Sequence, residues 1–94
     1  MKALIVALLL FTSLQAHAQV YVMPNEGGGE ITLTSRQCEH KGRTYQGLKE
    51  AYTWSNQLYL SGCWAVVDGN VHIVWNVNDR QERRVYSIQN FTPR

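Results

Sequence analysis

Two apolar runs, rich in β-branched and aromatic residues, flank an Asp68-Gly69 pair in the second half of the chain. The first run is Leu58–Val67 and the second is Asn70–Trp75. An Asp-Gly pair between such runs is a strong signal for a β-hairpin with a two-residue turn. The two runs are therefore predicted to be paired antiparallel strands.

The two-residue turn also fixes which residues face each other across the hairpin. Residues directly opposite share a face, so the larger apolar side chains gather on one side, which is predicted to be the core face. This face carries Leu58, Leu60, Gly62, Trp64, Val66, Val71, Ile73 and Trp75. Gly62 falls opposite Trp75, where the indole can lie over bare backbone. The other face is only half apolar and carries Cys63, which predicts that another piece of chain crosses it.

Three shorter segments complete the predicted sheet. They are Glu30–Thr34, Ala51–Trp54 and Arg83–Ile88. Between them, residues 35–47 predict a loop, with a helical turn just before Ala51, and Asn76–Glu82 predict a polar turn. Pro93 is expected to end the sheet because proline has no backbone N–H for a ladder. The fold class predicted is all-β: a small antiparallel meander of about five strands, curled or barrel-like, with one disulfide.

The first residues have the composition of a signal peptide rather than of a folded domain. Lys2 precedes an apolar run at Leu4–Phe11, and Ala16-His17-Ala18 is a small-x-small cleavage signal. We expect residues 1–18 to be removed, 19–29 to be a flexible N-terminal segment and 30–94 to be a small β domain. Val20–Met23 is read as a frayed edge strand or as disordered. The predicted location is periplasmic or secreted, without a stable membrane anchor.

The two cysteines, Cys38 and Cys63, are predicted to form a disulfide, because an even cysteine count in a short exported protein favours that state. Two alternatives stay open. Cys38 and Cys63 could be free thiols, or they could hold zinc together with His40 and His72, although the chain has no Cys-x-x-Cys pair.

Several of these features together resemble a group of small exported proteins of bacteria and their phages whose activity is not established. The shared features are a first strand of the type Ile31–Thr34, a cysteine soon after it, and a later series of motifs. In this sequence the series is Cys38, Gly62-Cys63-Trp64, Asp68-Gly69, Trp75, Tyr86 and Phe91. The resemblance covers most of the chain after residue 18. It implies a bacterial or phage source and an extracytoplasmic location, and it brings no catalytic residue.

Charge and aromatic content indicate where a partner would bind. The formal net charge of +2 falls to about +1 without Lys2, which argues against a nucleic-acid partner. The chain carries many aromatic residues for its size, and arginines cluster near its end. An exposed Tyr, Trp and Arg surface is typical of protein-binding hot spots. The candidate partner-binding residues are Arg80, Arg83, Arg84, Tyr45, Trp54 and Tyr59. The arginines are also consistent with a solvated strand edge that discourages pairing with other chains.

No set of residues in the sequence predicts catalysis. Cys63 and His72 would make a Cys–His pair only if Cys63 were not disulfide-bonded, and neither Ser61 nor Ser87 lies in a nucleophile-elbow motif. The carboxylates are scattered along the chain. We therefore expect a non-enzymatic binding module without a cofactor or metal, acting on an extracytoplasmic protein, for example as an inhibitor or accessory factor. A small envelope hydrolase or metal-dependent enzyme, and a structural envelope component, are the alternatives.

Overall fold

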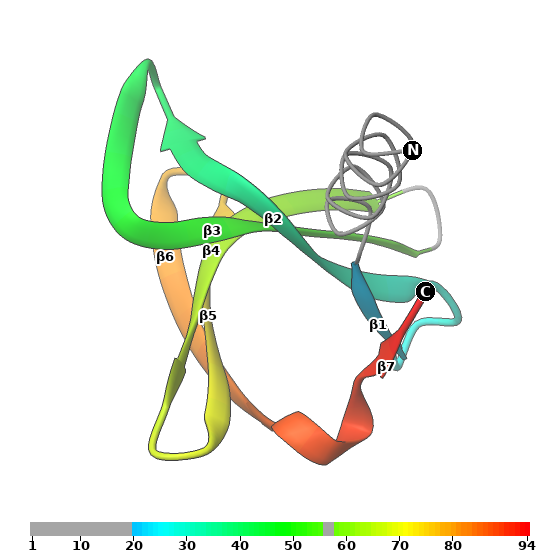
Figure 1. Cartoon of the computed structure of the whole chain (residues 1–94). Helices are drawn as coiled ribbons and strands as arrows, with labels where there is room; N and C mark the ends of the chain where they lie inside the picture. The colour runs from blue at the N-terminus through cyan, green and yellow to red at the C-terminus, as the bar shows by residue number, and fades with distance from the viewer. Residues whose placement is uncertain (1–19, 56–57) are drawn as a thin grey trace, which may run out of the picture.

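The computed structural model describes residues 20–55 and 58–94, which form one antiparallel sheet with a short 3-10 helix near its end. The elements are β1 (Tyr21–Pro24), β2 (Glu30–His40), β3 (Arg43–Ser55), β4 (Leu58–Val67), β5 (Asn70–Val77), β6 (Arg80–Ser87), η1 (Ile88–Asn90) and β7 (Thr92–Pro93). Their order in the sheet is β6-β5-β4-β3-β2-β1-β7. The sheet curls into a half-barrel (Figure 1), so the all-β, antiparallel and curled fold is confirmed. The expected leader, residues 1–18, and Gln19 lie outside the described residues.

The prediction of about five strands was wrong, because the described residues contain seven. The two additional strands come from the ends of the described chain. β1 lies within the segment 19–29 and pairs with β2 on one side and β7 on the other, with Val22 opposite Thr92. Pro93 does not stop the sheet, because β7 is an edge strand and a proline there need not donate to a further neighbour.

The hairpin around Asp68-Gly69 has the predicted register. Val67 pairs with Asn70, and further along the ladder Gly62 pairs with Trp75. Asp68 and Gly69 have φ values of 53° and 77°, the positive values at both central positions that a type I′ turn requires.

The stretch 35–47 is not the predicted loop. β2 continues to His40, a tight turn at Lys41 and Gly42 follows, and β3 begins at Arg43. Lys41 and Gly42 have φ values of 54° and 76°, so this turn resembles the one at Asp68-Gly69. No helical turn precedes Ala51, which lies inside β3. In the same way, the predicted polar turn 76–82 is reduced to two residues, and β6 begins at Arg80.

The concave side of the sheet is the core, as the alternation predicted. The buried core residues are Ile31, Leu33, Ala51, Val71, Ile73, Trp75 and Phe91, with Met23, Leu60, Trp64, Val77 and Tyr86 packed against them. Leu58 and Val66, which were assigned to the core face, lie near the ends of β4 and are exposed. At Gly62, an added Cβ would lie 3.1 Å from Cε3 of Trp75 and would overlap the Val74 carbonyl oxygen. The bare backbone therefore makes room for the indole.

Cys38 and Cys63 form the predicted disulfide, and it joins β2 to β4. β3 lies between these strands, so their Cα atoms would be roughly 10 Å apart in a flat sheet. The observed Cα–Cα distance is 5.5 Å. Register shifts between Leu33 and Cys38 mark the irregular part of β2, and an irregularity of this kind lets a strand bend. The crossing chain predicted at Cys63 is thus a bent strand rather than a loop.

Candidate binding surfaces

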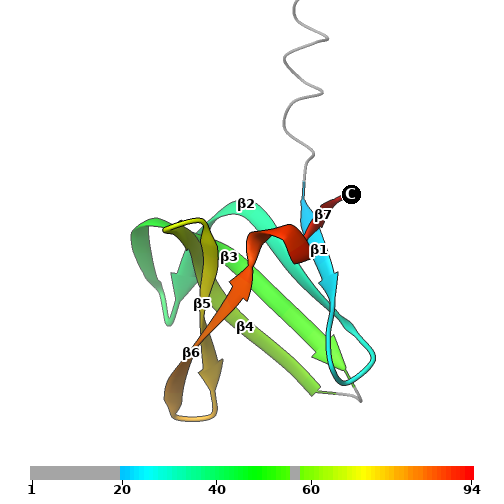
Figure 2. The ribbon, with the colours of Figure 1, turned by 90° about the horizontal axis from the view of Figure 1, so that it is seen from below.

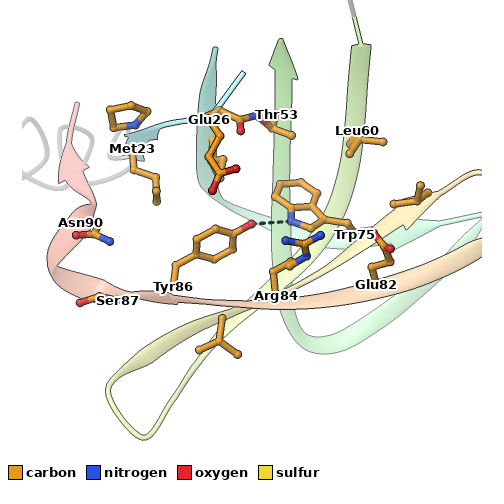
Figure 3. A pocket seen from close by; sticks show the side chains of 15 residues that line it. Met23, Glu26, Thr53, Leu60, Trp75, Glu82, Arg84, Tyr86, Ser87 and Asn90 are labelled. Carbon is orange, nitrogen blue, oxygen red and sulfur yellow. Dashed lines mark hydrogen bonds between the residues drawn. The ribbon is translucent and has the colours of Figure 1, made fainter. Parts of the chain in front are cut away.

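A cavity of about 450 Å³ opens on the concave side, between β6 and β1. We call it the seam pocket, because it lies where the half-barrel does not close. β6 and β1 are far apart in strand order, and the curl of the sheet places them on opposite sides of its interior (Figures 1 and 2). Its volume falls in the range of about 300–1,000 Å³ that is typical of small-molecule sites. Figure 3 shows the side chains around it.

The seam pocket has a mostly apolar floor and polar walls. Side chains of β2 to β5 make the floor, namely Ile31, Thr53, Leu60 and Trp75. One wall is β6, which contributes Glu82, Arg84 and Tyr86. The facing wall is the end of β1 and the turn after it, which contributes Met23, Pro24, Asn25 and Glu26.

Hydrogen bonds within the protein occupy some of these polar groups. The Trp75 Nε1–H donates to the Tyr86 hydroxyl oxygen at 3.1 Å, which ties the floor to the β6 wall. Asn25 Nδ2 donates to Thr53 Oγ1 at 2.7 Å, and that hydroxyl donates to the Glu30 carbonyl oxygen at 2.8 Å. Glu82 Oε1 lies 3.2 Å from the guanidinium of Arg80. The side chains of Arg84 and Glu26 form no ion pair within residues 20–55 and 58–94.

The three predicted arginines do not form one surface. Arg84 lies opposite Ile73 on the concave side and lines the seam pocket, and Arg80, opposite Val77, shares that side. Arg83 lies opposite Val74 on the convex side. All three are on β6, which is one of the two edge strands of the described sheet. The interpretation of the arginines as a strand edge is therefore consistent with their position.

Two of the three predicted aromatic residues lie together on the convex side. Trp54 pairs with Tyr59 across β3 and β4, and Tyr52 lies two residues before Trp54 on the same face. The rings of Tyr52 and Tyr59 are stacked, with centroids 6.3 Å apart. We call these three residues the aromatic patch. Tyr45 is not part of it, because it pairs with Cys38 on the distant part of the β2–β3 hairpin and is half-buried.

The Trp54 side of the β3–β4 hairpin exposes large apolar surface. Trp54 is 57% exposed and Tyr59 is 62% exposed; Leu58, which points to the other face at the same end of β4, is 59% exposed. Arg83 shares the convex side, but β5 separates its strand from the strand of Tyr59. The structure thus places aromatic side chains and arginines at separate positions.

Sequence reasoning missed the seam pocket. The alternation Glu82-x-Arg84-x-Tyr86 places these three side chains on one face, and the Asp68-Gly69 register could have been extended through the Asn78-Asp79 turn to place them opposite Trp75, Ile73 and Val71. The residues of the facing wall, Met23 and Glu26, carry no comparable signal, because their position depends on the pairing of β1.

The residues considered for catalysis or metal binding are spread over the sheet. Both cysteine sulfurs belong to the disulfide, so Cys63 has no thiolate to attack a substrate or bind zinc. His40 ends β2, whereas His72 lies opposite Ala65 in the β4–β5 hairpin. In the part of the chain that the structure describes, no group of three or more His, Cys, Asp or Glu side chains could hold a metal ion.

Two further findings concern membrane-spanning helices and similarity to known proteins. Over residues 20–55 and 58–94, the structure has no helix with the length and apolarity needed to cross a membrane. Comparisons of the chain with protein-family models, with curated proteins and with solved structures gave no match.

Proposed function

We propose that this protein is a non-enzymatic binding module that acts outside the cytoplasm and docks a protein partner through the aromatic patch. The observation that carries the proposal is the exposure of Trp54 and Tyr59, which face each other across the β3–β4 pairing. Large exposed apolar side chains that cluster in this way are typical of interaction sites. Tyrosine and tryptophan are also among the residues enriched in binding hot spots.

The sheet beneath the aromatic patch is well suited to present it. Tyr52 stacks on Tyr59, and Tyr52 and Trp54 are paired with β2 on one side and with β4 on the other. Aromatic side chains have few rotatable bonds, so ordering them in an interface costs little conformational entropy. A preorganised surface of this kind supports a role as an inhibitor or accessory factor of another protein.

An extracytoplasmic location is part of the proposal. The disulfide supports it, because disulfides persist in oxidising compartments such as the periplasm and the extracellular space. The signal-peptide composition of residues 1–18 supports it independently. A periplasmic or secreted protein would meet envelope proteins or extracellular enzymes as partners.

The test is affinity capture with the protein recovered after export, immobilised and exposed to periplasmic extract and to culture fluid. A double variant, Trp54→Ser with Tyr59→Ser, removes the two most exposed rings of the aromatic patch. The matched control is Val66→Ser with Val67→Ser, which removes two apolar side chains that are 48% and 46% exposed at the other end of β4.

We expect a partner to be retained by the unchanged protein and by the control, and to be lost from the aromatic double variant. Thermal unfolding of all three proteins shows whether each is folded. A partner that binds the aromatic double variant as strongly as the unchanged protein would contradict docking through this patch.

A further inference from the structure

We propose that the seam pocket binds a short apolar peptide with free termini, holding its carboxylate at Arg84 and Tyr86 and its ammonium group at Glu26. This site is distinct from the aromatic patch, because it lies on the concave side of the sheet. It therefore does not depend on the function proposed above.

The β6 wall carries hydrogen-bond donors that have no acceptor among the described residues. The Tyr86 oxygen accepts the Trp75 indole proton at 3.1 Å, so its own O–H proton remains for another acceptor. Arg84 lies two residues earlier on the same face of β6, and its guanidinium has no acceptor or ion-pair partner within residues 20–55 and 58–94. A guanidinium beside a hydroxyl donor is well suited to a carboxylate, which accepts several charge-assisted hydrogen bonds.

The facing wall offers the opposite charge. Glu26 lies in the turn after β1, and Figure 3 shows its side chain directed into the pocket from the side opposite Tyr86. The second pocket carboxylate, Glu82, is already compensated by Arg80. Arg84 and Glu26, both solvent-exposed, therefore lie on opposite walls without an ion-pair partner among the described residues.

This charge arrangement selects a zwitterion over a simple acid or a simple amine. A fatty acid would satisfy Arg84 but would leave Glu26 beside an apolar chain without a counter-charge. An alkylamine would satisfy Glu26 and leave Arg84 unpaired. A ligand with both charges at separate ends meets both groups, and the apolar floor of Leu60 and Trp75 accepts apolar side chains between them.

The strand edge at the pocket favours a peptide among zwitterions. β6 pairs only with β5 in the described sheet, so its other edge, which borders the pocket, has no ladder partner. A ligand carboxylate held at Arg84 places the neighbouring peptide amide beside the unpaired N–H and C=O groups of this edge, and such groups bind peptide backbone. Inward-pointing charges at an edge also serve to prevent such pairing. A peptide-binding edge predicts that a peptide binds here, whereas an edge protected by charges predicts that it does not.

Isothermal titration calorimetry with the exported protein, its disulfide intact, tests the ligand class. The probe is leucyl-leucine, and its blocked analogues are N-acetyl-leucyl-leucine, without an ammonium group, and leucyl-leucine amide, without a carboxylate. Octanoate serves as a simple acid with an apolar chain and no ammonium group. We expect leucyl-leucine to bind and each blocked analogue to bind roughly 10- to 100-fold more weakly, the usual effect of losing hydrogen bonds to a charged group. Absence of peptide binding, or tighter binding of octanoate or of the acetylated peptide, would overturn the proposal.

Two variants test the assigned residues, and each has a control on a different surface. Arg84→Gln should weaken leucyl-leucine binding but leave the affinity for leucyl-leucine amide unchanged, because the amide lacks the carboxylate. Glu26→Gln should weaken leucyl-leucine binding but not change binding of the acetylated peptide. The controls are Arg83→Gln, on the convex side of β6, and Glu39→Gln, on the β2–β3 hairpin. Equal effects of Arg84→Gln and Arg83→Gln would contradict the assignment.

The position of the bound peptide is checked by the indole N–H signals in NMR spectra. Trp75 lies on the floor of the seam pocket, whereas Trp54 belongs to the aromatic patch on the other side of the sheet. Titration with leucyl-leucine should shift the Trp75 signal and leave the Trp54 signal in place. The reverse pattern would show that the peptide binds the aromatic patch, and it would overturn the seam-pocket assignment without affecting the proposed docking function.

Discussion

Removal of the Cys38–Cys63 disulfide is expected to cost a large part of the stability of this protein. The bond joins residues 25 positions apart, and for a loop of this length the chain-entropy relation gives about 3.5 kcal/mol at 25 °C. A folded domain of ordinary size is stable by only about 5–15 kcal/mol, and small domains lie near the lower end. The disulfide therefore decides whether the sheet is stably folded at physiological temperature.

The double variant Cys38→Ala with Cys63→Ala measures this contribution. For a domain of this size, each kcal/mol shifts the melting temperature by about 4–8 °C, so we expect a decrease of roughly 14–28 °C. The slope of unfolding free energy against urea concentration should also increase, because the unfolded chain without the bond exposes more surface. Both cysteines are buried, so packing defects at the alanines add to the loss.

The matched control is the unchanged protein after reduction with a phosphine. Its melting temperature should fall toward that of the double variant, whereas the same reductant should leave the variant unaffected. A double variant that melts within about 5 °C of the oxidised protein would refute the reasoning. It would mean that the β2–β4 crossing is held by packing and hydrogen bonds alone.

Three further predictions test the packing and the surface. Gly62→Ala should destabilise the protein by about 1–3 kcal/mol in urea unfolding, because the new methyl meets the Trp75 ring and the Val74 carbonyl; Ser61→Ala, on the other face, should change stability by less than about 0.5 kcal/mol. Trp64→Ala should lower the free energy of unfolding by roughly 3 kcal/mol. Trp64→Phe should lower it by only about 1 kcal/mol, since the phenyl ring keeps most of the packing and loses the Nε1 hydrogen bond to the Thr34 carbonyl. Equal costs of the two variants would show that the ring itself contributes little. Replacing all three β6 arginines (Arg80, Arg83 and Arg84) by serine should leave thermal unfolding nearly unchanged, because exposed ion pairs contribute about 0–1 kcal/mol; a loss of more than about 2 kcal/mol would show a structural role.

The parts of the fold that could be predicted are those where burial alternates along a strand. Burial alternates along β5, and the Asp68-Gly69 turn fixes the register of β4 against it; in β4, Cys63 on the other face is also buried, where the disulfide joins it to β2. The alternation therefore identified both the hairpin and its core face. The same turn geometry at Lys41 and Gly42 was not recognised, because most of the residues around it are exposed on both faces. Without a buried face, a strand has no apolar periodicity to reveal it.

The remaining strands depend on contacts that no local pattern encodes. β1 and β7 are short, and each is held by the other end of the chain, with Tyr21 opposite Pro93. The seam pocket depends on the same contact, because β1 supplies the wall that faces β6. The exposure of Trp54 and Tyr59 was correctly expected, but their position beside Tyr52, away from Tyr45, required the observed register of β3 and β4.

The side chains of β6 give a physical reason why the half-barrel stays open. A closed barrel would bury the concave face of every strand, and on β6 that face carries Glu82 and Arg84. Transfer of a charged side chain out of water costs several kcal/mol unless it gains a well-placed partner and further hydrogen bonds. Glu82 has such a partner in Arg80 at the solvent-exposed end of the strand, but Arg84 faces the pocket without one among the described residues. Closure of β6 onto β1 would therefore bury the Arg84 guanidinium without a partner for its charge among the described residues. The opening leaves that guanidinium exposed to solvent and accessible to a ligand carboxylate.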